Sequence, residues 1–383
     1  MIRGAQSVLY SAAAAFLLAS PLEAADKPPF TVARSAASPQ ISRLFRKTDG
    51  WVGADAAYSV PLSAARTLWT FGDTWIGRIR GGKRIHCTMV NNSIALQSHG
   101  RLAPQLDFRW GRQDGKPVAF WRPEIAGTYY WPGDGAMVDG KLYVFLHVIR
   151  PKPDNPEPFQ FEAVEDLVLQ VDNPLEDLAR WRSRIVKIGN SARVINFGVA
   201  CLTDGEHLYA YCSYPPAGKR LAGHPTVLAR IDRQHLSALD MSAWQYWCNA
   251  GAPGHQGQWQ RRLENPVILF EDGAPEMSVK RVAGIAGFIA AYMPPFSRTI
   301  FLRHAPAPQG PWSERIAAYR CPEKDPRILV YSAKAHPQLA PGKLRLALTY
   351  CRNSEQFARH FDQPEIYFPQ GVEVLLAPTA SRK

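Results

Sequence analysis

The sequence lacks the short motifs that identify several large enzyme classes. It contains no GxSxG nucleophile elbow, no HExxH pair, no Walker phosphate loop, and no GxGxxG run directly after a candidate strand. Each of these motifs holds a nucleophile, a zinc ion or a phosphate group by its spacing, so their absence disfavours the matching chemistries. We therefore expect an activity that needs no bound cofactor and no metal ion.

Cysteine is also scarce, with six residues in 383 and no CxxC pair, which disfavours a cysteine-bound zinc ion. An even number allows three disulfides in an exported protein, although spacing alone does not give the pairing. Small buried residues on strands are the alternative interpretation. The six are Cys87, Cys201, Cys212, Cys248, Cys321 and Cys351.

Long apolar runs are missing beyond residue 25. Residues 1–25 are typical of a signal peptide, because Arg3 precedes an apolar run at 8–19 and small residues near Ala24 suit cleavage. That run is shorter than the roughly 20 apolar residues that cross a bilayer, and an uncleaved anchor is the alternative. We expect an exported protein, periplasmic or extracellular, with no transmembrane segment.

Acidic residues are in deficit, since 33 Asp and Glu oppose 45 Lys and Arg and give a formal net charge of +12. The basic residues are scattered rather than clustered with aromatic residues, so nucleic acid is not an expected partner. An exported basic protein is suited to meeting an acidic glycan or an anionic cell envelope. Charge does not choose between these, and the sequence does not predict an oligomeric state.

The residues that are abundant indicate an all-β chain. The sequence has 14 tyrosines, 11 tryptophans and 32 prolines, and it shows few long helical patterns. One pattern recurs five times: a small or polar leading segment, a tight turn, and a strand rich in Leu, Tyr, Ala and Phe. The turns lie at 63–65, Asp139-Gly140, Asp204-Gly205, Ala283-Gly284 and Pro341-Gly342.

These repeats predict a five-bladed β-propeller. Asp-Gly between alternating apolar runs is a strong hairpin signal, and intervals of about 58–80 residues hold the four short strands of a blade. We expect the propeller over residues 46–375, after an extended lead-in at 26–45. Residues 162–181 are expected to form a short helix or an insertion, and a pair of two-sheet sandwiches is the alternative fold.

The first repeat brings two acidic residues together. Asp55 and Asp73 are equidistant from the turn at 63–65, so an antiparallel pair places them opposite each other, with Cβ atoms roughly 4.5–5.5 Å apart. Neighbouring carboxylates repel, and the pKa of one is raised unless another group neutralises them. A glycosidase uses such a pair, whereas a structural hairpin gains nothing from it. A bulge that shifts the register is the alternative.

The other leading segments bring further polar residues toward the same axis, because the first strand of each propeller blade lines the central channel. Polar groups that converge in a hollow are typical of a ligand site. Those of the second to fifth repeats are Asp134, Asn196, Glu276, Lys334 and His336.

Several of these segments resemble one secreted bacterial family. The motifs are Phe-Gly-Asp-Thr at 71–74, Asn-Asn-Ser-Ile at 91–94, Trp-Pro-Gly-Asp-Gly at 131–135, Glu-Met-Ser-Val at 276–279 and Tyr-Ser-Ala-Lys-Ala-His-Pro at 331–337. The family is catalogued as a domain of unknown function and includes endo-D-arabinanases. It is similar in shape to the five-bladed propeller arabinanases, xylosidases and invertases.

The resemblance implies a five-bladed propeller with a carbohydrate site at the channel mouth and a glycoside hydrolase activity. Asp55 and Asp73 would be the catalytic acids, and the substrate would be a polysaccharide or oligosaccharide, an arabinofuranosidic one among the candidates. The chain departs from the family at 53–57, where Gly-Ala-Asp-Ala-Ala replaces a more glycine-rich approach.

A short separation between the two acids fits a retaining glycosidase, in which carboxyl groups about 5–5.5 Å apart serve as nucleophile and acid/base. We assign Asp55 as the nucleophile and Asp73 as the acid/base, with exchanged roles as the alternative. Glu276 is a rival general acid, or else an ion-pair partner of Lys280 or Arg281.

Four further residues are predicted to contact substrate, each with a structural alternative. Asp134 would bind sugar hydroxyls or cap a turn, and Trp131 would stack on a sugar ring or pack in the core. Asn91 and Asn92 would reach substrate from a neighbouring strand or form a turn at the strand edge.

Two other functions stay open. Lys334 and His336 would offset the negative charge of the channel or donate hydrogen bonds to substrate. In a lyase or esterase acting on an acidic polysaccharide, these two residues and nearby tyrosines would perform the reaction instead. A non-catalytic carbohydrate-binding propeller is the alternative from a different class.

Overall fold

The computed structural model describes residues 27–99, 105–155, 159–189, 194–214, 224–249 and 257–379. The expected signal peptide at 1–25 lies outside these residues. No helix in the described ranges is long and apolar enough to cross a membrane. All six cysteines fall within them and none forms a disulfide, with Cys87 half-buried and the other five buried.

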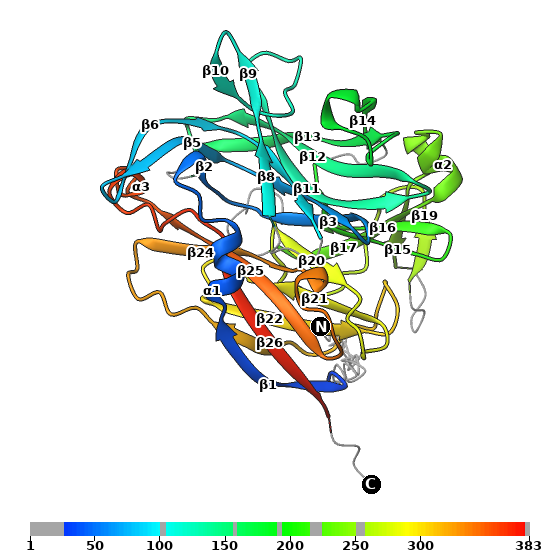
Figure 1. Ribbon diagram of the computed structural model, residues 1–383. Helices are drawn as coiled ribbons and strands as arrows, with labels where there is room; N and C mark the ends of the chain where they lie inside the picture. Colours follow the sequence, from blue (N-terminus) through cyan, green and yellow to red (C-terminus); the bar gives the residue numbers. More distant parts are fainter. Residues whose placement is uncertain are drawn as a thin grey trace, which may run out of the picture.

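Five antiparallel sheets follow one another along the chain, which confirms the predicted all-β, five-bladed propeller (Figure 1). Each sheet runs from an innermost strand outward in chain order, with one exception described below. Blade 1 contains β3 (Tyr58–Ser63), β4 (Arg66–Phe71), β7 (Ser93–Ser98) and β8 (Gln105–Arg109). Blade 2 contains β11 (Tyr129–Val138), β12 (Lys141–Pro151), β13 (Phe161–Val171) and β14 (Ser183–Lys187).

The later blades continue the pattern. Blade 3 contains β15 (Phe197–Asp204), β16 (His207–Ser213), β17 (Thr226–Asp232), β18 (Gln245–Cys248) and β19 (Gln258–Gln260). Blade 4 contains β20 (Met277–Lys280), β21 (Phe288–Tyr292), β22 (Thr299–Ala305) and β23 (Ile316–Arg320). Blade 5 contains β24 (Ile328–Ala335), β25 (Arg345–Ser354), β26 (Gln370–Pro378) and, from the other end of the chain, β1 (Phe30–Ala37).

The last blade is the exception because it is completed by the first strand of the chain. β1 pairs with β26 from Phe30–Pro378 to Ala37–Val372, and Figure 1 shows the two side by side, blue against red. The helix α1 (Pro39–Leu44) follows, with Ser38 Oγ accepting from Ile41 N as its cap. Part of the segment that we expected to lead in to the propeller therefore lies within its last blade.

The predicted tight turns are present in blades 1 to 3, whereas longer loops join the first two strands of blades 4 and 5. In blade 2 the turn joins Val138 to Lys141, with Asp139 and Gly140 between them at φ +48° and +77°. Two consecutive residues with positive φ match the right-handed twist of the flanking strands, and Asp-Gly adopts them at low cost. The expectation of a helix or insertion at 162–181 is wrong for its first part, which is strand β13, and a 3-10 turn occupies only Leu178–Arg180.

The core lies between the blades. Strand β12 is buried without interruption from Leu142 to Ile149, because neighbouring blades cover both of its faces. Aromatic rings fill the gaps, as where Phe145 of blade 2 and Phe197 of blade 3 lie with ring centroids 5.7 Å apart. This packing holds the innermost strands rigidly around the axis, which is where the polar residues lie.

Blade 1 has an insertion that positions the two predicted catalytic acids. Strands β2 (Asp49–Ala54), β5 (Thr74–Arg80) and β6 (Lys83–Val90) form a separate sheet, and β9 (Gly111–Gln113) and β10 (Lys116–Val118) form a projecting hairpin (Figure 1). Ala54 and Thr74 form the last residue pair of the inserted sheet, and Tyr58 and Thr70 form the first residue pair of blade 1. Asp55 and Asp73 lie at the junction between the two sheets.

Candidate functional site

Asp55 and Asp73 are neighbours across the ribbon that joins the inserted sheet to blade 1. Asp55 N donates to Asp73 O at 3.3 Å, and Gly72 N donates to Asp55 O at 3.3 Å. Both residues are half-buried. The register therefore brings the two acids together as the hairpin symmetry predicted, even though the strands break there.

The backbone around Asp55 is unusual. Ala56 and Ala57 follow it at φ +65° and +55°, a left-handed conformation that non-glycine residues rarely adopt. The carbonyl of Ala56 accepts from Ser332 Oγ at 3.0 Å and from Lys334 Nζ at 2.7 Å. Blade 5 therefore holds blade 1 in this conformation, and such imposed strain is common where a protein must aim a functional side chain.

Asp73 is fixed by two N–H donors. Trp131 Nε1 donates to Asp73 Oδ1 at 3.0 Å, and Asn91 Nδ2 donates to the same oxygen at 3.2 Å. Burial raises the pKa of Asp73 to about 6, against the opposing effect of these two donors. Asp73 therefore holds its proton up to about pH 6, and Trp131 and Asn91 both contact it.

Asp55 is fixed by two phenols. Tyr331 and Tyr367 donate to Asp55 Oδ2 at 2.7 and 3.0 Å. Burial raises the pKa of Asp55 well above its ordinary value, and the negative charges of Asp73 and Glu276 raise it further. The phenol pKa values of both tyrosines are themselves raised by burial, so these groups stay protonated and act as donors.

Glu276 is the third acid at the site. Its Oε2 accepts from Lys334 Nζ at 2.7 Å and from Ser332 Oγ at 2.8 Å. The Lys334 side chain is only 1% exposed and its ammonium group lies 4.1 Å from the centre of the Tyr58 ring. The ion-pair partner of Glu276 is therefore Lys334, and the expected pairing with Lys280 or Arg281 is wrong.

Besides the buried Lys334, three predicted binding residues are turned away from the site. Asp134 is fully buried, and its Oδ2 accepts from Lys280 Nζ at 2.8 Å and from Cys201 N at 3.0 Å. It therefore ties three blades together and has no free face for a sugar. Asn92 is also fully buried, with its amide bonded to the backbone of Trp121 and Tyr130.

His336 is the third of these residues. It is fully buried, with Nδ1 2.7 Å from Ser59 Oγ and Nε2 2.8 Å from Thr349 Oγ1. Burial and the charge of Lys334 lower its pKa well below the ordinary value, so it is neutral. Its role is to join blade 5 to blade 1. Asn196 is half-buried, at φ +44°, and makes no hydrogen bond with the described groups around Asp55.

Two residues at the site were not predicted. Tyr331 was part of a motif that we recognised but was assigned no role, and Tyr367 lies in a segment with no distinctive pattern. Tyr331 could have been predicted from its position at the start of a leading segment, on the same strand as Lys334. No sequence signal marks Tyr367, which follows Asp55 by 312 residues.

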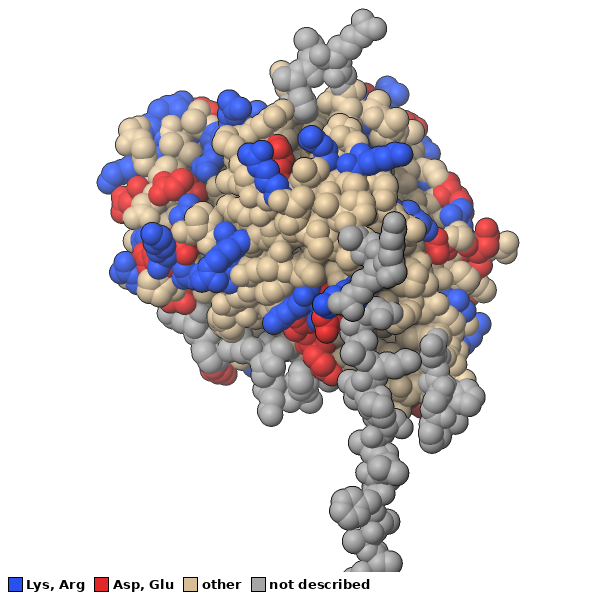
Figure 2. Space-filling view, turned by 90° about the horizontal axis from the view of Figure 1, so that it is seen from below, with Lys and Arg blue, Asp and Glu red and all other residues tan. Residues whose placement is uncertain are grey.

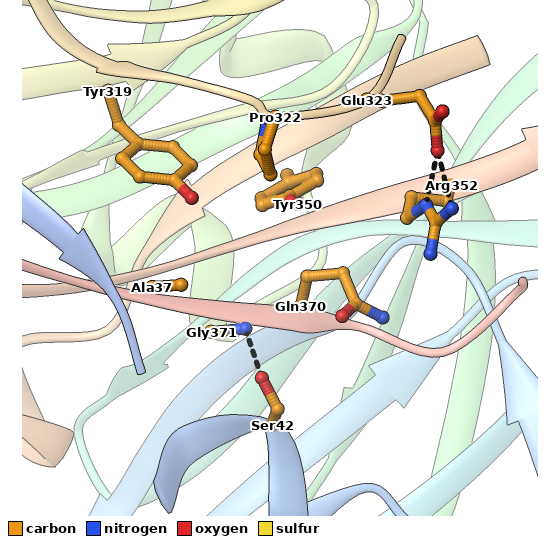
Figure 3. Close-up of a pocket in the computed structure, with 9 residues that line it drawn as sticks. All are labelled: Ala37, Ser42, Tyr319, Pro322, Glu323, Tyr350, Arg352, Gln370 and Gly371. Carbon is orange, nitrogen blue, oxygen red and sulfur yellow. Dashed lines mark hydrogen bonds and ion pairs between the residues drawn. The ribbon is translucent and has the colours of Figure 1, made fainter. Parts of the chain in front are cut away.

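A cavity of about 350 Å³ lies elsewhere in the molecule (Figure 3). Its walls come from β1, α1, β23, β25, β26 and the segment after β23, and Arg352 Nε donates there to Glu323 Oε2 at 3.0 Å. Its one carboxylate is thus neutralised by an ion pair, and the three acids described above are not among its lining residues. The lining residues are Ala37, Ser42, Tyr319, Pro322, Glu323, Tyr350, Arg352, Gln370 and Gly371.

Seen from below, Lys and Arg form separate groups around a broad uncharged area (Figure 2). Among the residues that the structure describes, no group of three or more His, Cys, Asp or Glu side chains is arranged to hold a metal ion.

Comparison with known proteins gives a family and a fold. The model of the family described as "Domain of unknown function (DUF5005)" matches residues 39–374. A "putative hydrolase" from Bacteroides ovatus ATCC 8483 superimposes with a TM-score of 0.71 at 16% identity, over 90% of this chain and 93% of that chain. At that identity the likeness shows a shared fold. None of the curated proteins compared with the chain matches it.

Two more distant likenesses are to glycoside hydrolases. The GH43_1 enzyme from Xanthomonas citri, complexed with xylotriose, has a TM-score of 0.47 at 13% identity, over 89% of this chain and 92% of that chain. The α-L-arabinofuranosidase from Lactobacillus brevis has a TM-score of 0.47 at 11% identity, over 88% of this chain and 92% of that chain.

Proposed function

The chain belongs to the DUF5005 family, a domain of unknown function, and from that premise we propose that it is an exported glycoside hydrolase. Its substrate is a polysaccharide or oligosaccharide, with arabinofuranosidic chains as the first class to test. Asp55 and Asp73 break the glycosidic bond at the mouth of the propeller channel. This proposal goes beyond the family assignment, which gives no activity.

One observation supports it above the others: the way in which each carboxyl group is held. Asp55 Oδ2 accepts from two phenols, and Asp73 Oδ1 accepts from two N–H groups. Among the described residues, Asp55 Oδ1 and Asp73 Oδ2 accept no hydrogen bond. One oxygen of each acid is therefore fixed while the other has no hydrogen-bond donor among the described groups, which suits a reaction between two carboxyl groups.

The electrostatics fit the same chemistry. The two acids are half-buried neighbours; burial raises the pKa of both, and the negative charge of Asp73 raises that of Asp55 further, so the pair keeps one proton at a pH where isolated aspartates are ionised. Glycoside hydrolysis needs one carboxylate and one carboxylic acid at the same time. The site provides both without a cofactor.

The proposed reaction has two steps. Asp55 Oδ1 attacks the anomeric carbon while the Asp73 proton passes to the departing glycosidic oxygen, which gives a glycosyl ester on Asp55 and a free alcohol. Asp73 then takes a proton from water, and the hydroxide attacks the same carbon and releases Asp55. The sequence of two displacements retains the anomeric configuration. Trp131 supports the acid/base through its N–H, and its half-buried ring is available to a sugar face.

The test is a screen of arabinans and other polysaccharides for release of reducing ends. We expect wild-type protein to cleave at least one, and Asp55→Asn and Asp73→Asn to lower the rate by about 10²–10⁴-fold, the usual contribution of a positioned acid or base. Proton NMR of the first product should show the retained anomer. Asp114→Asn, in the exposed β9–β10 turn, is the matched control.

Each other outcome has a definite meaning. Cleavage that persists in both variants would exclude the Asp55–Asp73 pair. A glycan that binds without being cleaved would favour the non-catalytic carbohydrate-binding propeller. Inversion of the anomer would mean that a water molecule lies between sugar and carboxylate, with Asp55 as a base.

A further inference from the structure

A line of hydrogen bonds leads from Trp75 to Asp55. Trp75 Nε1 donates to His360 Nδ1 at 3.2 Å, and His360 Nε2 lies 2.8 Å from Asn353 Oδ1. Asn353 Nδ2 donates to the Tyr331 hydroxyl at 3.5 Å, and Tyr331 donates to Asp55 Oδ2 at 2.7 Å. The line thus joins the inserted sheet of blade 1, helix α3 (Arg359–Asp362) and two strands of blade 5 to one carboxylate.

The direction of every bond in this line is fixed by chemistry. An indole N–H can only donate, so His360 Nδ1 is the acceptor and the ring proton is on Nε2, from which it is donated to Asn353 Oδ1. Ser354 N also donates to Asn353 Oδ1 at 2.7 Å, which identifies that atom as the oxygen. The amide nitrogen therefore faces Tyr331, and all four donors point toward Asp55.

We propose that Trp75, His360 and Asn353 are positioning residues that act through Tyr331 to keep Asp55 as the ionised member of the acid pair. Donors aligned in one direction polarise one another, so the last one in the line is stronger than an isolated phenol. Burial and the charges of Asp73 and Glu276 oppose this effect by raising the pKa of Asp55, and where the line outweighs them the proton of the pair lies on Asp73. This inference rests on the proposed function only in naming Asp55 the nucleophile.

A buried arginine holds the line in place. Arg84 is 2% exposed, and its guanidinium group donates to four backbone carbonyls: Val52 at 2.8 Å, His360 at 2.6 Å, Ile366 at 2.9 Å and Pro364 at 3.0 Å. It therefore fixes both ends of the segment that joins His360 to Tyr367, the second phenol on Asp55. Burial and the Arg84 charge lower the pKa of His360 to about 4, so the ring keeps a single proton over most of the pH range.

Gly53 lets this segment approach Asp55. A Cβ atom at Gly53 would lie 2.5 Å from Arg84 Nη2 and 2.6 Å from the Tyr367 carbonyl oxygen, and the residue is at φ +132°. Only glycine fits there. The titratable and charged groups that face Asp55 from the packed elements are Asp73, Glu276, Tyr331, Lys334, Cys351 and Tyr367.

The experiment measures the titration of Asp55 directly. Protein labelled with ¹³C at aspartate carboxyl carbons is titrated by NMR, and the Asp55 signal is identified by its absence in Asp55→Asn. We expect Tyr331→Phe to raise the apparent pKa of Asp55 by about one unit and Asn353→Leu by about half a unit, because each removes donors that favour the anion. Leucine matches asparagine in shape and adds no charge.

A double variant tests whether Asn353 acts through Tyr331. If it does, Tyr331→Phe/Asn353→Leu shifts the Asp55 titration no further than Tyr331→Phe alone. Asn173→Leu is the matched control, since the half-buried Asn173 likewise accepts from a backbone N–H, that of Arg182, and donates through its amide, to Arg180 O, but makes no contact with the line. It should leave the titration unchanged. Trp75→Phe supplies a second variant of the line, with a smaller shift in the same direction.

An unshifted Asp55 titration in folded Asn353→Leu, or in Trp75→Phe where Asn353→Leu does not fold, would overturn the proposal. Additive shifts in the double variant would do the same. The NMR readout needs no substrate, so it separates this inference from the function. Shifts as expected in a protein that cleaves no glycan would end the glycosidase proposal and leave the hydrogen-bond line established.

Discussion

Gly72 and Asp55 lie against each other at the site. Gly72 precedes Asp73, and a Cβ atom at this position would lie against Asp55 Oδ1, well inside van der Waals contact. Asp55 Oδ1 is the oxygen to which we assign the attack on the sugar. The absence of a side chain at residue 72 therefore sets where that oxygen lies.

Gly72→Ala should uncouple activity from stability. The backbone at residue 72 does not require glycine, but the new methyl group must displace the Asp55 carboxyl. A shift of about 1 Å costs roughly 10²-fold in rate, so we expect at least that loss on the substrate found by screening, with a cooperative thermal transition kept. Gly189→Ala, where a Cβ meets nothing within 4 Å, should change neither. Full activity in Gly72→Ala would contradict the assignment of Oδ1.

At the scale of elements, the ring depends on one strand from the far end of the chain. β1 supplies the outer strand of blade 5, and its first residue, Phe30, is 1% exposed in the core shared by blades 4 and 5. A propeller blade that loses its outer strand exposes a sheet edge and the apolar face beneath it. Closure through β1 thus links the two ends of the chain.

Phe30→Ala should weaken this closure measurably. Removing a fully buried phenylalanine ring costs about 3–5 kcal/mol of unfolding free energy through lost burial and the cavity left behind. Chemical denaturation followed by tryptophan fluorescence gives that energy from the shift in midpoint. Phe296→Ala, at a ring 63% exposed, should change it by no more than about 0.5 kcal/mol. Equal midpoints for the two variants would mean that β1 is not needed to close the ring.

At the scale of the whole molecule, blades 5 and 1 are joined by neutral and charged groups buried together. His336 connects Ser59 of β3 to Thr349 of β25, and Lys334 donates to Ala56 beside it. The pKa of His336 is held well below its ordinary value by burial and by the charges of Lys334 and Lys280. Protonating the His336 ring would add a third positive charge between the blades, beside those of Lys334 and Lys280.

The contribution of His336 to the stability of the protein should therefore fall in mild acid, while the raised carboxyl pKa values of Asp55 and Asp73 act in the opposite direction. Below about pH 6.5 the unfolded chain binds a proton at residue 336 that the folded chain excludes, so unfolding takes up protons and this contribution falls as pH drops, by up to about 1.4 kcal/mol per unit. His360, with its pKa of about 4, acts in the same direction. The midpoint temperature of thermal unfolding of His336→Gln should be lower than that of wild type at pH 7, and the difference between the two should narrow by pH 5.

His235→Gln provides the comparison, because His235 is exposed and ion-paired only with Asp240. The thermal unfolding midpoint of His235→Gln should equal that of wild type at both pH values. A gap between wild type and His336→Gln that stays constant from pH 7 to pH 5 would contradict a neutral His336 in the folded state.

The sequence alone determined the blades and the acid pair, because both depend on local geometry. Asp-Gly turns specify hairpins within a few residues, and the equal spacing of Asp55 and Asp73 from one turn specifies their pairing across it. No knowledge of distant contacts is needed for either. These features are present in the structure where the pattern placed them.

The tertiary structure decided which polar groups face the channel mouth. Strands β11, β15 and β24 each contain a register shift, at 132–135, 197–200 and 331–334. A bulge reverses the alternation of side chains along a strand, so Asp134 and Lys334 turn inward to partners while Trp131 and Tyr331 reach the acids. Tyr367 and His360 come from hundreds of residues away, and only the closing of the ring brings them to Asp55.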